Sequence, residues 1–206
     1  MTEHLSLRER KKLATREALS HAAWRLMLER GLNAATPEAI AEAAEVSPRT
    51  FRNYFASREE AIIDGLVQRG GGTIPDAIRA RPHDEPLWDS FMQVLPTAVT
   101  QLVGARDQLH LLMRVVGESP AMMAQLLVVF ERSHTIMADV VTERTGTDIR
   151  RDLAPRMLAA AVGAALRTSV EMWAEGDVDA TLPDLIRQSL AQLRAGLPLG
   201  AEQATR

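Results

Sequence analysis

The chain has 206 residues, no cysteine and a formal net charge of −3, and 46% of its residues are hydrophobic while 25% are charged. This composition suits a globular protein with a sizeable core, and it excludes disulfide bonds, thiolate metal sites and a protein that coats nucleic acid through bulk positive charge. The N-terminal segment lacks an apolar stretch and no run of about 18 apolar residues occurs, so we expect a cytoplasmic protein with no signal peptide and no membrane span.

Nearly every segment carries apolar residues at helical spacing, and alternating strand patterns are missing, so the sequence predicts an all-α fold. The first predicted helix runs from Arg8 to Glu29, and Gly31 follows it where a left-handed residue ends many helices. The start of this helix holds a basic cluster, which is either a DNA-contacting patch or a solvated helix end: Arg8, Arg10, Lys11, Lys12 and Arg16.

Two very short helices follow the first one. Thr36-Pro37 and Ser47-Pro48 each combine an N-cap hydroxyl with a proline at the first helical position, where the missing N–H costs nothing. A capping box begins a fourth helix, because Ser57 and Glu60 are spaced to satisfy each other's N–H groups. We expect Gly70-Gly71-Gly72 to end this helix.

The rest of the chain predicts a connector with one short helix and then five longer helices. These run over Leu87–Val103, Asp107–Glu118, Pro120–Thr145, Leu153–Glu175 and Pro183–Ala195. The predicted organisation is a compact unit over residues 1–56 and a larger helical body over residues 57–206, in which residues 57–69 form the connecting helix.

Aromatic and cationic residues are concentrated in the stretch VSPRTFRNYF, which contains the third predicted helix. On a helical wheel Phe51 and Phe55 lie within about 40° of each other, so they share a face that packs on the preceding helix. Arg49 and Asn53 lie on the opposite face. An arginine on an exposed helix face often serves solubility alone, so this pattern by itself leaves both interpretations open.

Two short helices joined by a tight turn, with a small residue at Ala41 and an apolar one at Val46, match a helix-turn-helix. In that motif the outward face of the second helix enters the DNA major groove. Arginine can bond O6 and N7 of guanine together, and asparagine suits N6 and N7 of adenine. Ser47 at the helix N-terminus and the Tyr54 hydroxyl at its rim are placed to contact phosphates.

The stretch TPEAIAEAAEVSPRTFRNYFASREEAI resembles the DNA-binding signature of the tetracycline-repressor-like (TetR) family of helix-turn-helix transcriptional regulators. The long first helix and the glycine after it also fit that family, so the resemblance covers about 55 residues. It implies an N-terminal three-helix DNA-binding domain followed by a larger helical domain for ligand binding and dimerisation.

Three residues depart from the family pattern. Glu45 replaces the glycine of the turn, so we expect it to adopt an uncommon positive φ at some cost in strain. Pro37 replaces an apolar residue and serves as a helix starter. Arg58 replaces a lysine and keeps the positive charge.

The resemblance implies two sets of DNA contacts, of which base contacts specify sequence and phosphate contacts set register and affinity. The residues expected to face bases are Pro48, Arg49, Thr50, Arg52 and Asn53. The residues expected to hold the DNA backbone are Thr36, Ser47, Tyr54, Arg58 and the segment Arg10-Lys11-Lys12.

The resemblance also implies a homodimer in which the last two helices pack against their twofold copies. The segment MLAAAVGAALRTSV is nearly all small or apolar, which suits close helix packing on several sides, either in a dimer or in an ordinary monomer core. A dimer would place two recognition helices about 34–36 Å apart on a palindromic operator. The predicted interface residues are Ala160, Gly163, Ala164, Arg167, Leu185, Gln188 and Leu190.

A pocket for an apolar ligand is expected in the larger body, because seven of the nine methionines follow residue 90 and methionine adapts to irregular apolar shapes. Core filling accounts equally well for any single methionine, and the polar candidates are also compatible with the surface. The candidate pocket residues are Trp88, Phe91, Met92, His110, Met113, Arg114, Met123, Phe130, His134, Met137, Arg167, Glu171 and Trp173.

These observations predict a ligand-responsive transcriptional regulator, with a repressor favoured, whose partners are double-stranded operator DNA, a small-molecule effector and a second copy of the chain. The sequence contains no Gly-x-Ser-x-Gly, His-Glu-x-x-His or Gly-rich phosphate motif, and its histidines lack metal-ligand spacing, so we expect no enzyme activity, cofactor or metal. The alternatives are a helical protein-interaction module and an activator of the same fold.

Overall fold

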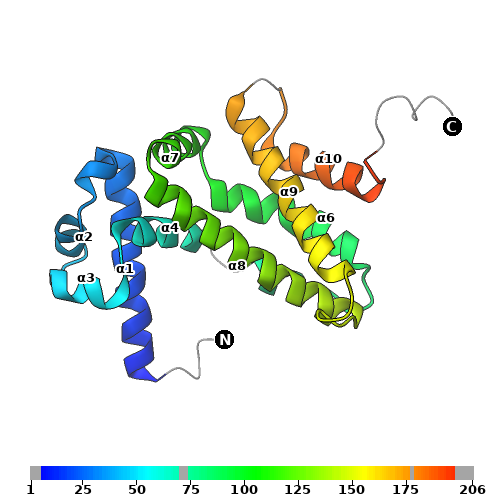
Figure 1. Cartoon of the computed structure of the whole chain (residues 1–206), viewed down its shortest axis with the longest axis horizontal. Helices are drawn as coiled ribbons and strands as arrows, with labels where there is room; N and C mark the ends of the chain where they lie inside the picture. The colour runs from blue at the N-terminus through cyan, green and yellow to red at the C-terminus, as the bar shows by residue number, and fades with distance from the viewer. Residues whose placement is uncertain (1–5, 70–73, 177–178, 198–206) are drawn as a thin grey trace. The chain divides into compact units, whose positions relative to one another are not determined.

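The computed structural model describes residues 6–69, 74–176 and 179–197, and these contain ten α-helices, one 3₁₀ helix and no strand (Figure 1). The all-α prediction is therefore confirmed. The chain divides into two compact units. Unit 1 comprises Met1–Arg69 and Asp107–Val128, and unit 2 comprises Gly70–Arg106 and Val129–Arg206.

Unit 1 is built around a long first helix and three short elements that follow it. Its helices are α1 (Leu7–Arg30), η1 (Leu32–Ala34), α2 (Pro37–Ala43), α3 (Pro48–Tyr54), α4 (Arg58–Gln68), most of α7 (Arg106–Glu118) and the first turns of α8 (Pro120–Thr145). The predicted starts are confirmed, since the hydroxyls of Thr36, Ser47 and Ser57 each accept an N–H of their helix. The glycine run at residues 70–72 lies outside the described residues.

The capping box predicted at the start of α4 forms only in half. The Ser57 hydroxyl accepts the Glu60 N–H at 3.1 Å, but the Glu60 carboxylate accepts the N–H of Ala56, at 2.8 Å, in place of that of Ser57. A complete capping box is found instead at the start of α1, between Ser6 and Glu9. Glu60 therefore holds Ala56, the residue before the N-cap, and so stabilises the turn that follows α3.

The two longest helices of the N-terminal segment, α1 and α4, cross at very short range. A Cβ atom added to Gly65 would lie 2.3 Å from the Ser20 carbonyl oxygen and 2.9 Å from the Trp24 Cβ. No larger residue fits there without backbone movement. This crossing packs α4 closely against α1, and both helices contribute buried apolar side chains.

Unit 2 packs one short helix and four longer helical segments around an aliphatic and aromatic core. They are α5 (Ile74–Arg79), α6 (Leu87–Val103), the rest of α8, α9 (Ala154–Glu175) and α10 (Leu182–Arg194), and α10 packs against both α6 and α9 (Figure 1). Phe91 and Leu95 of α6 are fully buried in this core, as are Ile186 and Leu190 of α10. The long predicted helices are thus confirmed, and the bounds of α6 and α8 match.

An arginine of α8 organises the connector between α5 and α6. The guanidinium of Arg144 donates to the carbonyl oxygens of Ile78 and Glu85, each at 2.9 Å. Arg81 and then Ser90 donate to the Glu85 carboxylate, and these bonds hold the pKa of Glu85 at about 2. The connector is therefore fixed by side-chain bonds, although its proline-rich sequence predicted only one short helix.

Within the described residues no single helix is both long and apolar enough to cross a membrane, and only the bent pair α7 and α8 meets that criterion jointly, by length and composition alone.

Candidate nucleic-acid interface and ligand pocket

Helix α3 of unit 1 has one buried face and one exposed face. Phe51 and Phe55 are 1% and 2% exposed, and their ring centroids lie 5.8 Å apart. Arg49, Arg52 and Asn53 are exposed on the other side. The predicted division of this helix into a packing face and a polar face is confirmed, while the DNA contacts themselves stay a prediction.

The turn before α3 adopts the backbone that its position in the motif requires. Glu45 has a φ of 55°, as expected for a residue in place of a glycine. Its side chain is exposed, so this turn does not bury the carboxylate. The Ser47 hydroxyl then accepts the Thr50 N–H at 3.0 Å and lies 2.9 Å from the Thr50 hydroxyl, which fixes the first turn of α3.

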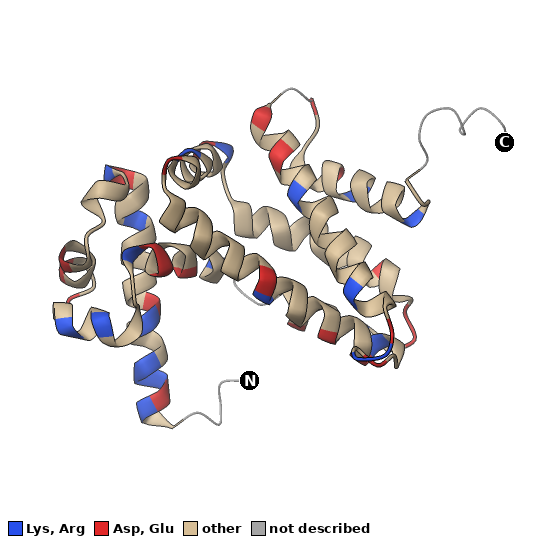
Figure 2. Ribbon diagram, in the orientation of Figure 1, with Lys and Arg blue, Asp and Glu red and all other residues tan. Residues whose placement is uncertain are grey.

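The N-terminal half of α1 contributes to the same surface. Lys12 of α1 and Asn53 and Tyr54 of α3 line one cleft of about 380 Å³, together with Arg16. Figure 2 shows Lys and Arg residues along α3 and along the N-terminal half of α1. Lys11 is exposed beside Lys12. The structure thus brings the predicted basic segment of α1 next to the polar face of α3, which are about forty positions apart in sequence.

Besides Ser47, two other residues predicted to contact the DNA backbone form side-chain hydrogen bonds within the chain. The Thr36 hydroxyl accepts the Ala39 N–H at 3.2 Å as the cap of α2. Arg58 donates to the Leu32 carbonyl oxygen at 3.0 Å and to Glu59 at 2.9 Å. Arg58 therefore ties the start of α4 to η1, a role that its position after a serine did not indicate. Arg52 lies 4.0 Å from Glu38 of α2 in an exposed pair.

Arg16 makes contacts in this region that the sequence did not predict, since it was named only as a member of the basic cluster. Its guanidinium donates to the Tyr54 carbonyl oxygen at 3.2 Å and to Asp64 of α4 at 2.7 Å, and it lies 4.4 Å from the centroid of the Phe55 ring. No local signal predicts these contacts, because the partners lie 38 and 48 positions away.

The predicted dimer residues divide between the core and the surface of unit 2. Leu185 and Leu190 are 6% and 0% exposed, because the apolar stripe of α10 packs on α6 and α9 of the same chain. A Cβ added to Gly163 would lie 2.4 Å from Nε2 of His134, so this glycine faces α8. The exposed members of the predicted set are Ala160, Ala164, Arg167 and Gln188.

The residues predicted to line a ligand pocket are scattered over several environments. Phe91 and Met137 belong to the core of unit 2, Trp88 and Met92 pack against that core, and Phe130 is 38% exposed. Arg167 and Glu171 form an exposed pair on α9, 3.8 Å apart. The members in unit 1 lie on exposed positions of α7 and α8: His110, Met113, Arg114 and Met123.

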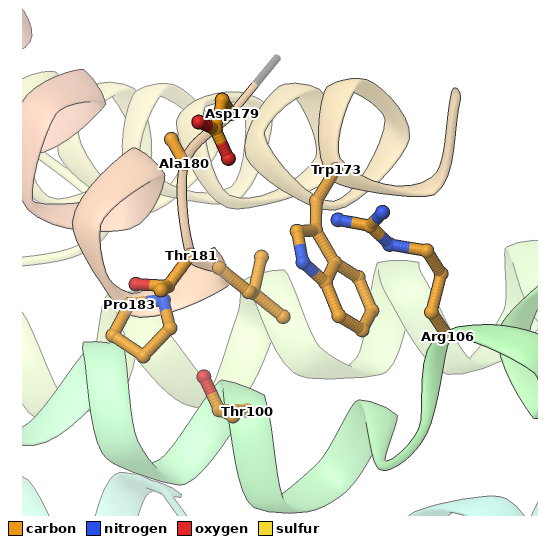
Figure 3. Close-up of a pocket in the computed structure, with 8 residues that line it drawn as sticks. Thr100, Arg106, Trp173, Asp179, Ala180, Thr181 and Pro183 are labelled. Carbon is orange, nitrogen blue, oxygen red and sulfur yellow. The ribbon is translucent and has the colours of Figure 1, made fainter. Parts of the chain in front are cut away.

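Unit 2 contains a pocket of about 380 Å³ between the C-terminal parts of α6 and α9 and the start of α10 (Figure 3). Its lining residues are Thr100, Arg106, Trp173, Asp179, Ala180, Thr181, Leu182 and Pro183. Of the residues predicted for a ligand, Trp173 is in this set. The Arg106 guanidinium lies 4.8 Å from the centroid of the Trp173 ring, and Figure 3 shows Asp179 apart from both.

No group of three or more His, Cys, Asp or Glu side chains that could hold a metal ion occurs among the residues that the structure describes.

Comparisons with known proteins agree with this arrangement. The family model of bacterial regulatory proteins of the tetR family matches residues 19–62, which include α2 and α3, and the model of the MftR C-terminal domain matches residues 85–198. The HTH-type transcriptional regulator TcmR of Streptomyces glaucescens is 32% identical over 187 residues, which cover 84% of this chain and 80% of that protein. This chain belongs to the TetR family of transcriptional regulators.

Solved TetR structures share the fold at lower identity. Thermus thermophilus FadR, a TetR-family transcriptional repressor in complex with lauroyl-CoA, is 22% identical with a TM-score of 0.60, covering 89% of this chain and 95% of its own. The fatty acid degradation regulator FadR from Bacillus halodurans is 19% identical with a TM-score of 0.60, covering 88% and 98%. The family is one of DNA-binding regulators and not of enzymes.

Proposed function

We propose that this TetR-family regulator is a repressor that binds a palindromic operator as a homodimer and releases it when a mainly apolar effector binds unit 2. The observation that carries the DNA-binding part is the geometry of α3. Two buried phenylalanines anchor a helix of seven residues, and its exposed face presents Arg49, Arg52 and Asn53. These are the side chains that bond guanine and adenine edges in the major groove.

The exposed face of α9 supports the homodimer. Leu153 and Met157 are 70% and 58% exposed, and Ala160 and Ala164 continue the same helical face. An apolar stripe of this kind on a helix of 22 residues suits a partner surface, and a twofold copy presents the same stripe. The copy would also supply the second recognition helix that a palindromic operator requires.

The pocket of unit 2 supports an effector that has both an apolar part and an anionic group. Trp173, Leu182 and Pro183 provide apolar walls, and the Arg106 guanidinium over the indole provides a positive charge. A carboxylate or phosphate would form charge-assisted hydrogen bonds with that guanidinium. The complex of the Thermus thermophilus relative with lauroyl-CoA, an acyl chain joined to an anionic carrier, is consistent with this class.

Operator binding is tested by selecting sequences from a random DNA pool with the purified full-length chain. We expect enrichment of an inverted repeat with half-sites about one helical turn apart. Arg49→Ala should weaken binding to that repeat by about 1–3 kcal/mol, while Arg151→Ala, which changes an arginine with an 87% exposed side chain outside unit 1, should leave it unchanged. Absence of sequence enrichment with the wild-type chain would refute the proposed function.

The effector site is tested by titrating the chain with lauroyl-CoA and with lauric acid while tryptophan fluorescence and operator release are followed. Arg106→Met should weaken binding of these anions about tenfold or more, because it removes charged hydrogen bonds. Arg151→Met is the matched control. Equal affinities for wild-type and Arg106→Met protein would place the effector elsewhere.

A further inference from the structure

We infer that Arg16 is a positioning residue that fixes the recognition helix α3 to α4, so that α4 sets the direction in which Arg49 and Asn53 point. This inference rests on the proposed DNA-binding function. It adds a residue of α1 that neither the helix-turn-helix motif nor its phosphate contacts include.

The contacts of Arg16 join three helices of unit 1. One terminal nitrogen, Nη1, donates to the carbonyl oxygen of Tyr54, the last residue of α3, at 3.2 Å. The other, Nη2, donates to Oδ1 of Asp64 on α4 at 2.7 Å. Because the last carbonyls of a helix have no partner within the helix, a cation there satisfies an acceptor and also complements the helix dipole.

The planar guanidinium has a third contact that fixes its orientation. Its central carbon lies 4.4 Å from the ring centroid of Phe55, the C-cap residue of α3. Phe55 is 2% exposed and its ring contacts that of Phe51, so core packing restrains the ring beneath the guanidinium. A lysine at this position would keep the charge, but it could not bond Asp64 and the Tyr54 carbonyl with a rigid fork.

Arg16 faces two carboxylates of α4, Asp64 at 2.7 Å and Glu60 at 3.9 Å, and the nearer one is itself held in place. Oδ2 of Asp64 accepts a hydrogen bond from Gln68 at 2.7 Å, which leaves Oδ1 directed at Arg16. Asp64 directly precedes Gly65, where α1 and α4 cross most closely. Arg16 lies one helical turn before Ser20, which belongs to that crossing. The side chain of Arg16 therefore connects the closely packed pair α1 and α4 to the end of α3.

The consequence for DNA binding follows from the length of α3. A helix of seven residues has little stability of its own, so its direction depends on contacts outside it. Its start is fixed by the turn and the Ser47 cap, and its end by Phe55 and Arg16. A displacement of α4 that moves Asp64 is therefore transmitted through Arg16 to the Tyr54 carbonyl. Because Asn53 directly precedes Tyr54, its side chain would move as well.

A different role must be distinguished by experiment. Arg16 lines the cleft with Lys12 and Asn53, and its side chain is 35% exposed, so a direct contact to a DNA phosphate is the competing interpretation. The two roles differ in the salt dependence of binding. Binding weakens as salt rises, so the slope of log K against log salt is negative. Loss of one phosphate contact makes this slope shallower by about 1, whereas loss of a positioning residue lowers the affinity without changing the slope.

The test measures operator affinity from low to high salt for the wild type, Arg16→Met, Arg16→Lys, Asp64→Asn and the double variant. Arg16→Met and Asp64→Asn should each weaken binding on the order of tenfold with the slope unchanged, and the double variant should be no weaker than Arg16→Met. Arg16→Lys should lie between the wild type and Arg16→Met. Lys12→Ala is the control for a phosphate contact, and its slope should become shallower by about 1.

Three outcomes overturn the inference: unchanged affinity in Asp64→Asn, a shallower salt dependence in Arg16→Met, or additive losses in the double variant. Thermal unfolding of each variant shows whether unit 1 is folded at the assay temperature. If Arg16→Met is unfolded, Asp64→Asn and Arg16→Lys decide the result. If the wild type itself binds no DNA selectively, the proposed function fails and not merely this inference.

Discussion

Helices α3 and α9 are both amphipathic, but they present different chemistry to solvent. Helix α3 of unit 1 has seven residues and exposes arginine and asparagine side chains. Helix α9 of unit 2 has 22 residues, and its N-cap leucine, a methionine and alanines line one exposed face. The first face offers hydrogen-bond donors and charge, and the second offers a surface for close apolar packing.

Under the proposed function, this difference would let one chain bind two kinds of partner, DNA and a second copy of itself. A short helix held from behind by phenylalanines can present all of its polar atoms to a DNA groove. A long helix with small side chains on its exposed face suits the approach of another helix. Three sets of substitutions probe this contrast, beginning with the one expected to have the largest effect.

Phe51→Ala should unfold the recognition region of unit 1 while unit 2 stays folded. Removing a fully buried phenylalanine costs about 3–5 kcal/mol. A seven-residue helix has few other apolar contacts with which to offset that loss. Hydrogen exchange should show loss of protection in α2 and α3 with protection retained in α6 and α9. Equal loss in both units would contradict the independence of their cores.

The two closely packed glycines should respond unequally to added methyl groups. Gly65→Ala forces a contact with backbone, so we expect a loss of about 1–3 kcal/mol. Gly163→Ala meets the end of the His134 side chain, which can rotate, so its loss should be smaller. Gly117 has no neighbouring atom within 4 Å, and Gly117→Ala serves as the control, with a gain of up to about 1 kcal/mol. Calorimetric unfolding should give this order.

Met157→Asp should convert a dimer into a monomer by placing a charge in the exposed apolar face of α9. We expect the dissociation constant of the dimer to rise about tenfold or more, because an unpaired charge at an interface is costly. Sedimentation equilibrium measures this change, with Gln93→Asp on the exposed side of α6 as the control. A chain whose mass is unaffected by Met157→Asp would not use this face for dimerisation.

Local sequence signals account for most of what could be predicted. Hydroxyl–proline pairs marked the starts of α2 and α3 because the caps are made by adjacent residues. The spacing of Phe51 and Phe55 identified the buried face of α3 for the same reason. The polar face of α3 followed directly, since it is the other side of a helix whose core side was known.

Contacts between distant segments could not be predicted in this way. The stripe containing Leu185 and Leu190 was correctly apolar, but the sequence does not say whether its partner is α6 of the same chain or a second copy. The same limit applies to Arg58, whose partner is the Leu32 carbonyl, and to Arg106, which reaches Trp173. In each case several partners are equally compatible with the sequence, and only the three-dimensional packing determines which one is contacted.

Base-by-base substitution of the operator tests most directly whether the exposed face of α3 contacts operator bases. For the wild type, each changed base pair within the contacted half-site should cost about 1–3 kcal/mol. In Asn53→Ala the penalty should vanish at one position in each half-site and persist at the others. If every penalty of the wild type persists unchanged in Asn53→Ala, this face of α3 does not contact the bases as we describe.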